Sequence, residues 1–397
     1  MNVKGPEMIT VDQALDLLFT LVRTGPEETV PLIEASGRVL ARPVAATRDQ
    51  PPFAASAMDG YAVLAADVRP GATLEVIGES AAGHRFDAAV GPGQAVRIFT
   101  GAPLPIGADR VIIQEDVTRD ANRITLGDNL GDNPHIRPAG GDFRIGQTLD
   151  APRRLSPSDV ALLASMNIAE VPVITRPRVA IISTGDELVM PGETPGPDQI
   201  IASNSFGLKA LLDDLGANAR LLPIARDSEN SLNAVFDLAE GADLVVTIGG
   251  ASVGDHDLVG PVAQKRGLEQ AFYKIAMRPG KPLMAGRMGD AAMIGLPGNP
   301  VSAMVCGHVF LAPMLRAMLG LGAARAARLS APLAVGLAAN GPREHYMRAT
   351  LANGTITAHP HQDSALLSVL SAANALLVRP VDDPARKAGE IMDYIPL

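Results

Sequence analysis

The spacing of apolar residues changes several times along the chain, and each spacing predicts a different kind of element. Near the N-terminus, apolar residues recur at helical spacing after the capping box at Thr10–Gln13. From about residue 51 to residue 136, the apolar runs become brief and are divided by turns, as at Arg110–Ile113. Helical spacing returns after Ser156, and the following Pro157 suits the first position of a helix. A β-rich insertion therefore separates two helices.

A different pattern begins near residue 177, where continuous apolar runs alternate with helical spacing. The clearest run is Leu244–Ile248, a continuous and mostly apolar, β-branched run, as in a strand buried on both faces of a parallel sheet. Similar runs are found at Val179–Ser183, Leu221–Ala225 and Ala291–Leu296, although Pro223 suits an edge strand better than a central one. Helices are expected between and after these strands, at Phe206–Leu215, Leu232–Ala239, Leu258–Lys265 and Val301–Leu319.

The last part of the chain returns to the alternation that is typical of strands. These strands are expected at Leu333–Leu337, Tyr346–Leu351, Thr355–Ala358 and Ala375–Val378. Earlier in the chain, further short elements are expected as strands at Leu74–Ile77, Ala95–Phe99 and Arg123–Leu126, and as a weak helical fragment at Leu32–Leu40.

These elements predict an elongated multidomain protein of the α/β plus β class. Residues 1–50 and 141–176 would form a connector in which the returning helix packs against the first one, around a β-rich insertion at 51–140. Residues 177–326 would form the central α/β domain, with a doubly wound, mostly parallel sheet. Residues 327–397 would form a small closing domain that resembles a β-barrel.

Composition narrows the class of protein. The 397 residues are 47% hydrophobic but only 3% aromatic, so the core must consist mainly of aliphatic side chains. A net charge of −9 argues against a nucleic-acid surface, which needs a basic face. The single cysteine, Cys306, excludes internal disulfides and a thiolate metal cage. No run approaches the length of a membrane span and no signal segment is visible, so we expect a cytoplasmic protein without a membrane partner.

Acidic residues and glycines follow the predicted strands of the α/β domain. Gly249 and Gly250 end the central strand, and the acids of this and the neighbouring strand ends are Asp186, Glu187, Asp227, Asp255 and Asp257. In open α/β sheets, ligands bind outside the carboxyl ends of the strands. For one loop alone, a turn with solvated acids is the simpler interpretation. Recurrence at several strand ends favours one shared crevice.

Three basic residues offer the opposite charge. Lys274, Arg278 and Lys281 are clustered in an otherwise acidic chain, and they could bind phosphate or another oxyanion. The alternative is a solvated basic loop. If the ligand carries phosphate, carboxylates would repel its oxygens, and Mg²⁺ between the two groups would remove that conflict. Glu187, Asp227 and Asp257 are therefore candidates for Mg²⁺ coordination or for positioning an attacking oxygen, and the sequence does not divide these roles.

Six motifs in order resemble one family along essentially the whole chain. They are Ser56–Ala62, Thr100–Pro103, Ser183–Glu187, Gly249–Gly254 with Asp257, Pro279–Pro282 and Pro297–Ser302. Each motif alone is weak, but together they resemble the MoeA family of molybdopterin molybdenumtransferases, which includes the E domain of gephyrin. The resemblance implies that molybdate is inserted into adenylylated molybdopterin and that AMP is released.

The resemblance and the residue chemistry together give a set of expected site residues. Asp59, Thr100, Arg348 and Ser364 receive roles on the molybdate side from the resemblance. Taken alone, Thr100 and the pair Asp59–Gly60 suit turns, and Arg348 and Ser364 carry no local signature. The expected catalytic residues are Asp59, Thr100, Glu187, Asp227, Asp257, Lys274 and Arg278. The expected substrate-binding residues are Gly249, Gly250, Ser252, Gly254, Lys281, Pro297, Gly298, Asn299, Arg348 and Ser364.

The chain departs from the family pattern in several places. Ala54 and Ala55 replace an Asp and an Asn, Gly141 replaces a Glu, and Arg278 replaces a Lys. These departures reduce the number of polar groups in the β-rich insertion. They leave open a divergent paralogue with weak activity or an altered metal preference.

The expected partners also follow from the resemblance. It implies an elongated homodimer, with the molybdopterin adenylyltransferase and downstream maturation proteins as further partners. Because the helical connector should hold the insertion away from the crevice of its own chain, we predict that Asp59 and Thr100 of one chain face Glu187 and Asp257 of the other. Two other classes remain open at this point: a non-catalytic protein that binds or scaffolds the cofactor, and another phosphate enzyme built on the same α/β domain. Retention of Glu187, Asp227 and Asp257 argues against a non-catalytic scaffold. The flanking domains argue against another phosphate enzyme, because such an enzyme needs only the α/β domain.

Overall fold

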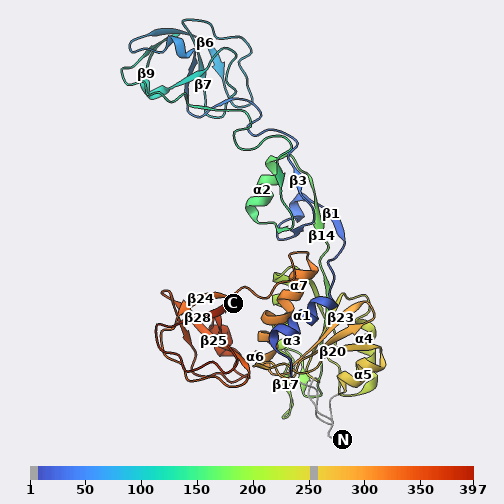
Figure 1. The fold of residues 1–397 in the computed structure, drawn as a ribbon. Helices are drawn as coiled ribbons and strands as arrows, with labels where there is room; N and C mark the ends of the chain where they lie inside the picture. The colour runs from blue at the N-terminus through green and yellow to red at the C-terminus, as the bar shows by residue number, and fades with distance from the viewer. Residues whose placement is uncertain (1–7, 251–257) are drawn as a thin grey trace.

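The computed structural model describes residues 8–250 and 258–397, and its bodies follow one another in an elongated molecule (Figure 1). The β-rich insertion lies at one end, and a small connector joins it to the α/β body. The closing β body lies beside the α/β body at the other end. The protein is thus a multidomain α/β protein with several separate sheets.

The first helix, α1 (Val11–Leu21), begins at the expected capping box. The Thr10 hydroxyl accepts a hydrogen bond from the Gln13 amide at 3.1 Å, and the Gln13 side chain accepts one from the Thr10 amide at 2.9 Å. The expectation that α1 packs against the returning helix is wrong. Its apolar stripe, with Leu15 and Leu18, is buried in the core of the α/β body. There α1 contacts β22 (Met284–Met288) and α7 (Ala312–Met318).

The connector is a four-stranded antiparallel sheet covered by α2 (Pro157–Ser165). The strand order is β1 (Glu27–Pro31), β14 (Glu170–Ile174), β2 (Val39–Leu40) and β13 (Arg153–Arg154). The predicted start of α2 is confirmed, because Ser156 caps it and Pro157 stands in its first turn. The weak helical fragment expected at Leu32–Leu40 is wrong beyond a single 3₁₀ turn at Leu32–Glu34, after which the chain forms β2.

The insertion contains a six-stranded sheet with an apolar cluster on each face. Its strand order is β8 (Arg110–Ile113), β5 (Gly60–Val63), β7 (Gln94–Ile98), β6 (Thr73–Ser80), β10 (Arg123–Leu126) and β9 (Val117–Asp120). Short pairs attach this sheet to the connector: β4 (Ala55–Ser56) with β11 (Ile136–Arg137), and β3 (Val44–Ala45) with β12 (Thr148–Leu149).

The α/β body is a mixed six-stranded sheet with helices on both faces (Figure 1). The parallel part is β18 (Asn218–Leu221), β15 (Arg178–Ser183), β19 (Leu244–Ile248) and β23 (Ala291–Leu296). β22 and β20 (Leu268–Phe272) continue the sheet in antiparallel orientation. The covering helices include α3 (Asn204–Asp214), α4 (Glu229–Leu238) and α5 (Val259–Lys265).

One predicted strand of this sheet is displaced. The run Leu221–Ala225 does not form the strand, because β18 ends at Leu221. Pro223 has no N–H to donate to a neighbouring strand. β18 is the edge of the sheet, as the proline indicated. After the bond from the Leu222 amide to the Ile181 carbonyl, Ala225 rejoins the neighbouring strand through an isolated bridge to Thr184.

The long helix Pro300–Met318 crosses the core of the α/β body. It consists of α6 (Pro300–Cys306), a π-helical turn at Gly307–Leu311 and α7. Pro313 cannot donate the hydrogen bond to the carbonyl four residues earlier, and this accounts for a widened turn. Among the described residues, this helix alone is long and apolar enough to span a membrane, which corrects the expectation that no run approaches that length. Since 72% of its apolar window is buried, it is a core helix.

The closing body is a sheet that curls into a half-barrel. Its order is β21 (Met277–Arg278), β25 (Glu344–Ala352), β27 (Ala375–Arg379), β28 (Ile391–Pro396) and β24 (Leu329–Pro332), and β26 (Thr355–Ala358) also pairs with β25. An isolated bridge between Leu333 and Ile356 brings the far strands together. The strand expected at Leu333–Leu337 is wrong, since β24 ends at Pro332. β21 belongs to the α/β segment and attaches the half-barrel to it.

Candidate active site

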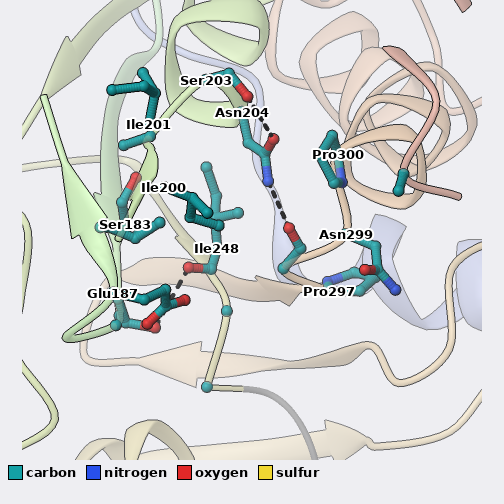
Figure 2. Close-up of a pocket in the computed structure, with 18 of the residues that line it drawn as sticks. Ser183, Glu187, Ile200, Ile201, Ser203, Asn204, Ile248, Pro297, Asn299 and Pro300 are labelled. Atoms are coloured by element: carbon teal, nitrogen blue, oxygen red, sulfur yellow. Dashed lines mark hydrogen bonds between the residues drawn. The ribbon is translucent and has the colours of Figure 1, made fainter. Parts of the chain in front are cut away.

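A crevice of about 710 Å³ opens at the carboxyl ends of β15, β19 and β23 (Figure 2). Its lining includes many of the residues that the sequence predicted, namely Glu187, Asp227, Gly249, Gly250, Lys281, Pro297, Gly298 and Asn299. These residues come from separate loops, and the parallel order of the strands brings the loops to one edge. Its size is typical of a small-molecule site.

Glycines allow the loops at the floor of the crevice to touch. Gly249 has φ = 90°, and a Cβ there would lie 2.8 Å from the carbonyl oxygen of Thr184. Gly250 has φ = 59°, and a Cβ there would overlap the Val259 side chain. A larger residue at either position would therefore push apart the loops that follow β15 and β19.

Glu187 is held in a clamped loop at the rim of the crevice. The Arg226 guanidinium donates hydrogen bonds from Nη1 to the carbonyl oxygens of Gly185, Asp186 and Leu188, at 3.4, 2.9 and 3.1 Å. The Glu187 carboxylate folds back over Gly185, so a Cβ at Gly185 would collide with it. Arg226 thus fixes the backbone that presents Glu187. Sequence reasoning missed this role, although Arg226 directly precedes the predicted Asp227.

Asp227 is tied to the same loop. Its backbone amide donates to the Asp186 carboxylate at 3.2 Å, and Ser228 then caps α4. Asp186 itself does not line the crevice but supports Asp227 from behind. Two neighbouring strand ends therefore deliver one carboxylate each, Glu187 and Asp227, to the crevice.

Sequence reasoning also missed the opposite wall of the crevice. The Asn204 side chain donates to the carbonyl oxygen of Gly298 at 2.7 Å and so joins the start of α3 to the loop after β23 (Figure 2). Ile200 and Ile201 add apolar surface on the Glu187 side of the crevice, where the Ile200 amide donates to the Glu187 carbonyl at 2.8 Å, and 58% and 37% of their surface is exposed. The signal that could have indicated Asn204 is its place at the expected start of a helix that follows a strand end.

The described residues do not form a metal cage of protein ligands alone. No group of three or more His, Cys, Asp or Glu side chains is arranged to hold a metal in the part of the chain that the structure describes. Mg²⁺ is commonly held by one or two carboxylates together with water and substrate phosphates. Glu187 and Asp227 therefore fit a Mg²⁺ whose coordination is completed by substrate.

The predicted basic cluster does not converge on the crevice. Lys281 lines it, but the Lys274 ammonium lies over the Tyr273 ring, 5.7 Å from its centroid. Arg278 is in β21, where it lies opposite His345 in the parallel pairing of β21 with β25 of the half-barrel. The sequence run from 274 to 281 is therefore divided between two places.

Arg278 lies close enough to His345 and Arg348 to act on both electrostatically; we call these three residues the cationic cluster. Arg348 is fully buried, and its Nη2 donates to the carbonyl oxygens of His361 and Asp363 at 3.3 and 2.9 Å. Its Nε and Nη1 have no partner among the described residues, and neither does the His345 Nε2. Burial, followed by the charges of Arg278 and Arg348, lowers the pKa of His345 to about 4. Burial also lowers the pKa of Arg348; the Asp363 carboxylate opposes this effect, and the Arg278 charge adds to it.

Ser364 connects the cationic cluster to the crevice. The preceding carbonyl, of Asp363, accepts from Arg348, and the carbonyl of Ser364 accepts from the Val301 amide at 3.0 Å. Val301 is in the first turn of the long helix, and the next residue, Ala365, lines the crevice. Arg348 itself does not line the crevice, and the backbone of residues 363–365 joins it to the crevice wall.

Asp59 and Thr100 meet in the insertion. The Asp59 carboxylate accepts from the Thr100 amide at 2.7 Å and from its hydroxyl at 2.8 Å. The hydrogen bond from the Thr100 amide lowers the pKa of Asp59 most. The hydrogen bond from the Thr100 hydroxyl and the charge of Arg97 lower it further. Within one chain, the structure does not bring this pair to the crevice, because the insertion lies at the far end of the molecule (Figure 1). The predicted site residues Ser252, Gly254 and Asp257 lie outside the described residues, as does Asp255.

Comparisons with known proteins match every body. Residues 9–167 match the MoeA N-terminal region (domains I and II), residues 180–317 a probable molybdopterin binding domain, and residues 330–397 the MoeA C-terminal region (domain IV). The molybdopterin molybdenumtransferase of Haemophilus influenzae is 39% identical over 317 residues, which cover 79% of this chain and 78% of that protein. The one from Nostoc sp. is 35% identical and covers 96% of this chain and 92% of that protein.

Solved structures agree with this result. The MoeA protein of Pyrococcus horikoshii superposes with a TM-score of 0.84 at 28% identity and covers 98% of this chain and 100% of that one. The match extends over all four bodies in Figure 1 rather than over the α/β body alone. The chain belongs to the MoeA family of molybdopterin molybdenumtransferases.

Proposed function

We propose that this chain inserts molybdate into adenylylated molybdopterin, with release of AMP. The observation that carries the proposal is the pairing of two opposite environments across one rim. The crevice offers carboxylates and glycine loops, and the cationic cluster beside it offers buried, unpaired donors. A buried guanidinium without an anion is costly, so Arg348 is suited to a small oxyanion such as molybdate.

In the crevice, the loop groups would hold the pterin phosphate and its adenylyl group. Lys281 and the backbone around Gly249 and Gly250 supply positive charge and N–H donors at the end of β19. The start of the long helix at Asn299–Pro300 points its positive dipole end at the same space. Ile200 and Ile201 give the apolar wall against which a flat ring can pack.

Glu187 and Asp227 would hold Mg²⁺ in this proposal, together with Asp257 from outside the described residues. Bound there, the ion would polarise the phosphorus and stabilise charge on the leaving phosphate. Arg226 keeps the Glu187 loop in place, and Asp186 keeps Asp227 in place. The oxyanion side belongs to Arg348 and Ser364, with Arg278 adding charge.

We also propose a homodimer with shared sites. Asp59 and Thr100 form a rigid pair but lie far from the crevice of their own chain (Figure 1). A two-fold partner could bring its Asp59 and Thr100 to this crevice, as most oligomers close with two-fold symmetry. The division into a connector, a β insertion, an α/β domain and a closing domain is part of the same proposal, with α1 moved from the predicted connector to the α/β domain. So are a cytoplasmic location and the adenylyltransferase and maturation proteins as partners.

The departures from the family leave this proposal intact. Ala54 and Ala55 engage the fold through their backbone, since the Ala54 carbonyl accepts from the Leu104 amide and Ala55 pairs with Arg137. A Cβ at Gly141 would lie 3.0 Å from the carbonyl oxygen of Pro138, so a larger residue there requires a local shift. Ala54 and Ala55 are in the insertion and Gly141 is in the returning connector segment, and none of the three lines the described crevice.

The activity is tested with the full chain. Purified protein is incubated with adenylylated molybdopterin, Mg²⁺ and molybdate, and both AMP and active molybdenum cofactor are measured. The proposal predicts that both appear together and that a chelator stops them. Binding of the substrate without any AMP release would instead support a non-catalytic cofactor-binding protein.

The shared site is tested separately. Chains with Thr100→Ala and Glu187→Ala are co-expressed with different tags, and the mixed dimer is isolated. Shared sites predict one doubly damaged and one intact site, so the mixed dimer recovers about half of wild-type activity. If each site lies within one chain, both sites carry a lesion and activity stays at the level of the single variants.

A further inference from the structure

A second cavity, of about 420 Å³, lies where the connector joins the α/β body. We call it the hinge pocket. Both chain crossings line it: Arg23–Pro26, which leads from α1 into β1, and Thr175–Pro177, which leads from β14 into β15. Asp243 and Asp290 place it at the amino ends of β19 and β23, and the crevice lies at the carboxyl ends of the same strands. The hinge pocket is therefore separate from the proposed active site.

The hinge pocket carries an excess of positive charge in an acidic protein. Its charged lining consists of four guanidinium groups and two carboxylates, from Arg23, Arg176, Arg178, Arg287, Asp243 and Asp290. Arg178 is paired with Asp243 at 2.8 Å, which neutralises one of each. Because the chain has a net charge of −9, a local group of arginines does not increase the magnitude of its net charge and so adds nothing to its solubility. Convergent arginines in a cavity are typical of anion recognition.

Two of these arginines are held in place and two are available. Arg287 donates from Nη2 to the carbonyl oxygens of Thr20 and Leu21 at 3.0 and 2.9 Å, so the end of α1 fixes it. Asp243 fixes Arg178. The exposed side chains of Arg23 and Arg176 form no hydrogen bond or ion pair with another described residue.

Other groups near the hinge pocket leave these two arginines available. Asp213 is the carboxylate that Arg176 influences. Burial acts to raise the pKa of Asp213, but the pKa is lowered overall, mainly by the hydrogen bond from Lys209. The charge of Arg176 adds a weaker lowering. Since Asp213 is already bonded to Lys209 at 2.5 Å, it does not occupy Arg176. The carbonyl oxygens at the end of α7 are also engaged, because Met318 accepts from the Gly25 amide at 2.8 Å.

We propose that the hinge pocket binds a nucleoside monophosphate or a closely similar phosphorylated ring compound. Arg23 and Arg176 would close on the phosphate, with Arg178 and Arg287 behind them. A cavity of 420 Å³ is larger than inorganic phosphate needs and lies within the range of small-molecule sites. Leu21, Pro26 and Met318 give apolar lining for a ring.

Binding here would also stiffen the joint between the two bodies. Arg23 is in the first crossing and Arg176 is in the second, so one phosphate held by both joins the two segments. Besides the pocket, the two sides are linked by bonds such as Gly25 N–H to Met318 and Arg154 to the carbonyl of Asp214 at 2.6 Å. A bound ligand would therefore reduce local opening of residues 21–26 and 175–178.

The test is hydrogen–deuterium exchange of the full chain, with and without 5′-AMP. Protection is expected in residues 21–26 and 175–178, separately from any protection in the crevice segments 183–188 and 200–204. In the variant Arg23→Ala/Arg176→Ala, half-maximal protection of the hinge segments should need at least tenfold more AMP. Protection of the crevice segments should be unchanged. Arg48→Ala/Arg69→Ala removes the same charge from two exposed arginines in the connector and insertion segments and should change neither.

Three outcomes would overturn the proposal. The first is absence of hinge protection in the wild-type chain at any AMP concentration. The second is hinge protection that persists in Arg23→Ala/Arg176→Ala. The third concerns the ligand: equal protection by inorganic phosphate at the same concentration would remove the ring compound and leave a simple anion site. Failure of the molybdenumtransferase assay affects none of these readouts, since they report binding at the opposite edge of the sheet.

Discussion

The crevice and the cationic cluster lie next to each other but handle charge in opposite ways. The crevice presents Glu187 and Asp227 on solvent-facing loops, where water or a metal ion can accompany them. The cluster buries Arg348 completely and leaves two of its nitrogens without a partner among the described residues. Exposed carboxylates keep their hydration and carry little desolvation penalty, whereas each unsatisfied buried donor lowers the stability of the fold by about 1–3 kcal/mol.

This difference indicates what each region binds. Arg348 is pre-organised for a ligand that brings its own negative charge, because its Nε and Nη1 have no hydrogen-bond partner among the described residues, although the Asp363 carboxylate attracts the guanidinium. The nearby pair Arg379 and Asp383 shows the contrasting arrangement, since both are buried and the carboxylate accepts directly from the guanidinium at 2.5 Å. One buried arginine is structural, and the other is open to an oxyanion.

The largest expected effect comes from removing a crevice acid. Glu187→Ala should lower AMP release by about a hundredfold or more, because it removes a ligand for Mg²⁺ while leaving the fold intact. Asp257→Ala should do the same. Steady-state AMP release with and without EDTA measures the effect. Glu193→Ala is the control, since Glu193 is in the same loop region but outside the crevice and accepts from the Met190 amide. Full turnover of wild type in EDTA would remove the metal from this account.

The next effect separates Arg348 from Arg379. Arg348→Met should lower AMP release at sub-saturating molybdate by about thirtyfold, while the free energy of unfolding changes by less than about 2 kcal/mol, since unpaired donors are lost together with two hydrogen bonds. Arg379→Met should instead destabilise the chain by about 3 kcal/mol or more, because Asp383 would stay buried and lose that partner. Urea denaturation measures both. Equal losses of stability would make Arg348 a structural arginine.

A third expectation concerns pH. The unfolded His345 imidazole titrates near pH 6.5, and the folded one at about 4. Between these two pH values, protons bind the unfolded chain preferentially. The contribution of neutral His345 to the free energy of unfolding is therefore complete above pH 6.5 and is lost as the pH falls toward 4. Between pH 7 and pH 5 the loss should be about 2 kcal/mol. His345→Gln should flatten this slope, and His84→Gln, at an exposed histidine, should not. An unchanged slope in His345→Gln would place the pH dependence elsewhere.

The smallest expected effect tests the clamp on the crevice side. Arg226→Ala should lower kcat about tenfold with little change in KM, because the Glu187 loop loses three hydrogen bonds but no group that binds substrate. Arg220→Ala is the matched control, at an exposed arginine that donates to the Glu240 carbonyl. A change in KM alone would mean that Arg226 contacts substrate directly.

The sequence could predict the crevice because its signals are local. Strand Leu244–Ile248 and its glycines follow one another in the chain, and the rule for parallel sheets then brings the strand ends together. The caps of α1 and α2 were predictable for the same reason, since a capping box depends on four consecutive residues.

Long-range contacts could not be predicted in this way. α1 is an ordinary amphipathic helix, and nothing in its sequence says that its apolar face packs in the α/β core rather than against α2. Arg348 and Ser364 had no local signal and came only from the family resemblance. Arg226 and Asn204 were missed because each acts through bonds to a loop distant in sequence.

One measurement tests the division of labour between the two regions most directly. The molybdate dependence of AMP release is recorded for wild type, Arg348→Met and Glu187→Ala at saturating adenylylated molybdopterin. The account predicts that Arg348→Met raises the half-saturating molybdate concentration about tenfold or more and keeps most of the maximal rate, whereas Glu187→Ala lowers the maximal rate without raising that concentration. An unchanged half-saturating molybdate concentration in Arg348→Met would contradict it.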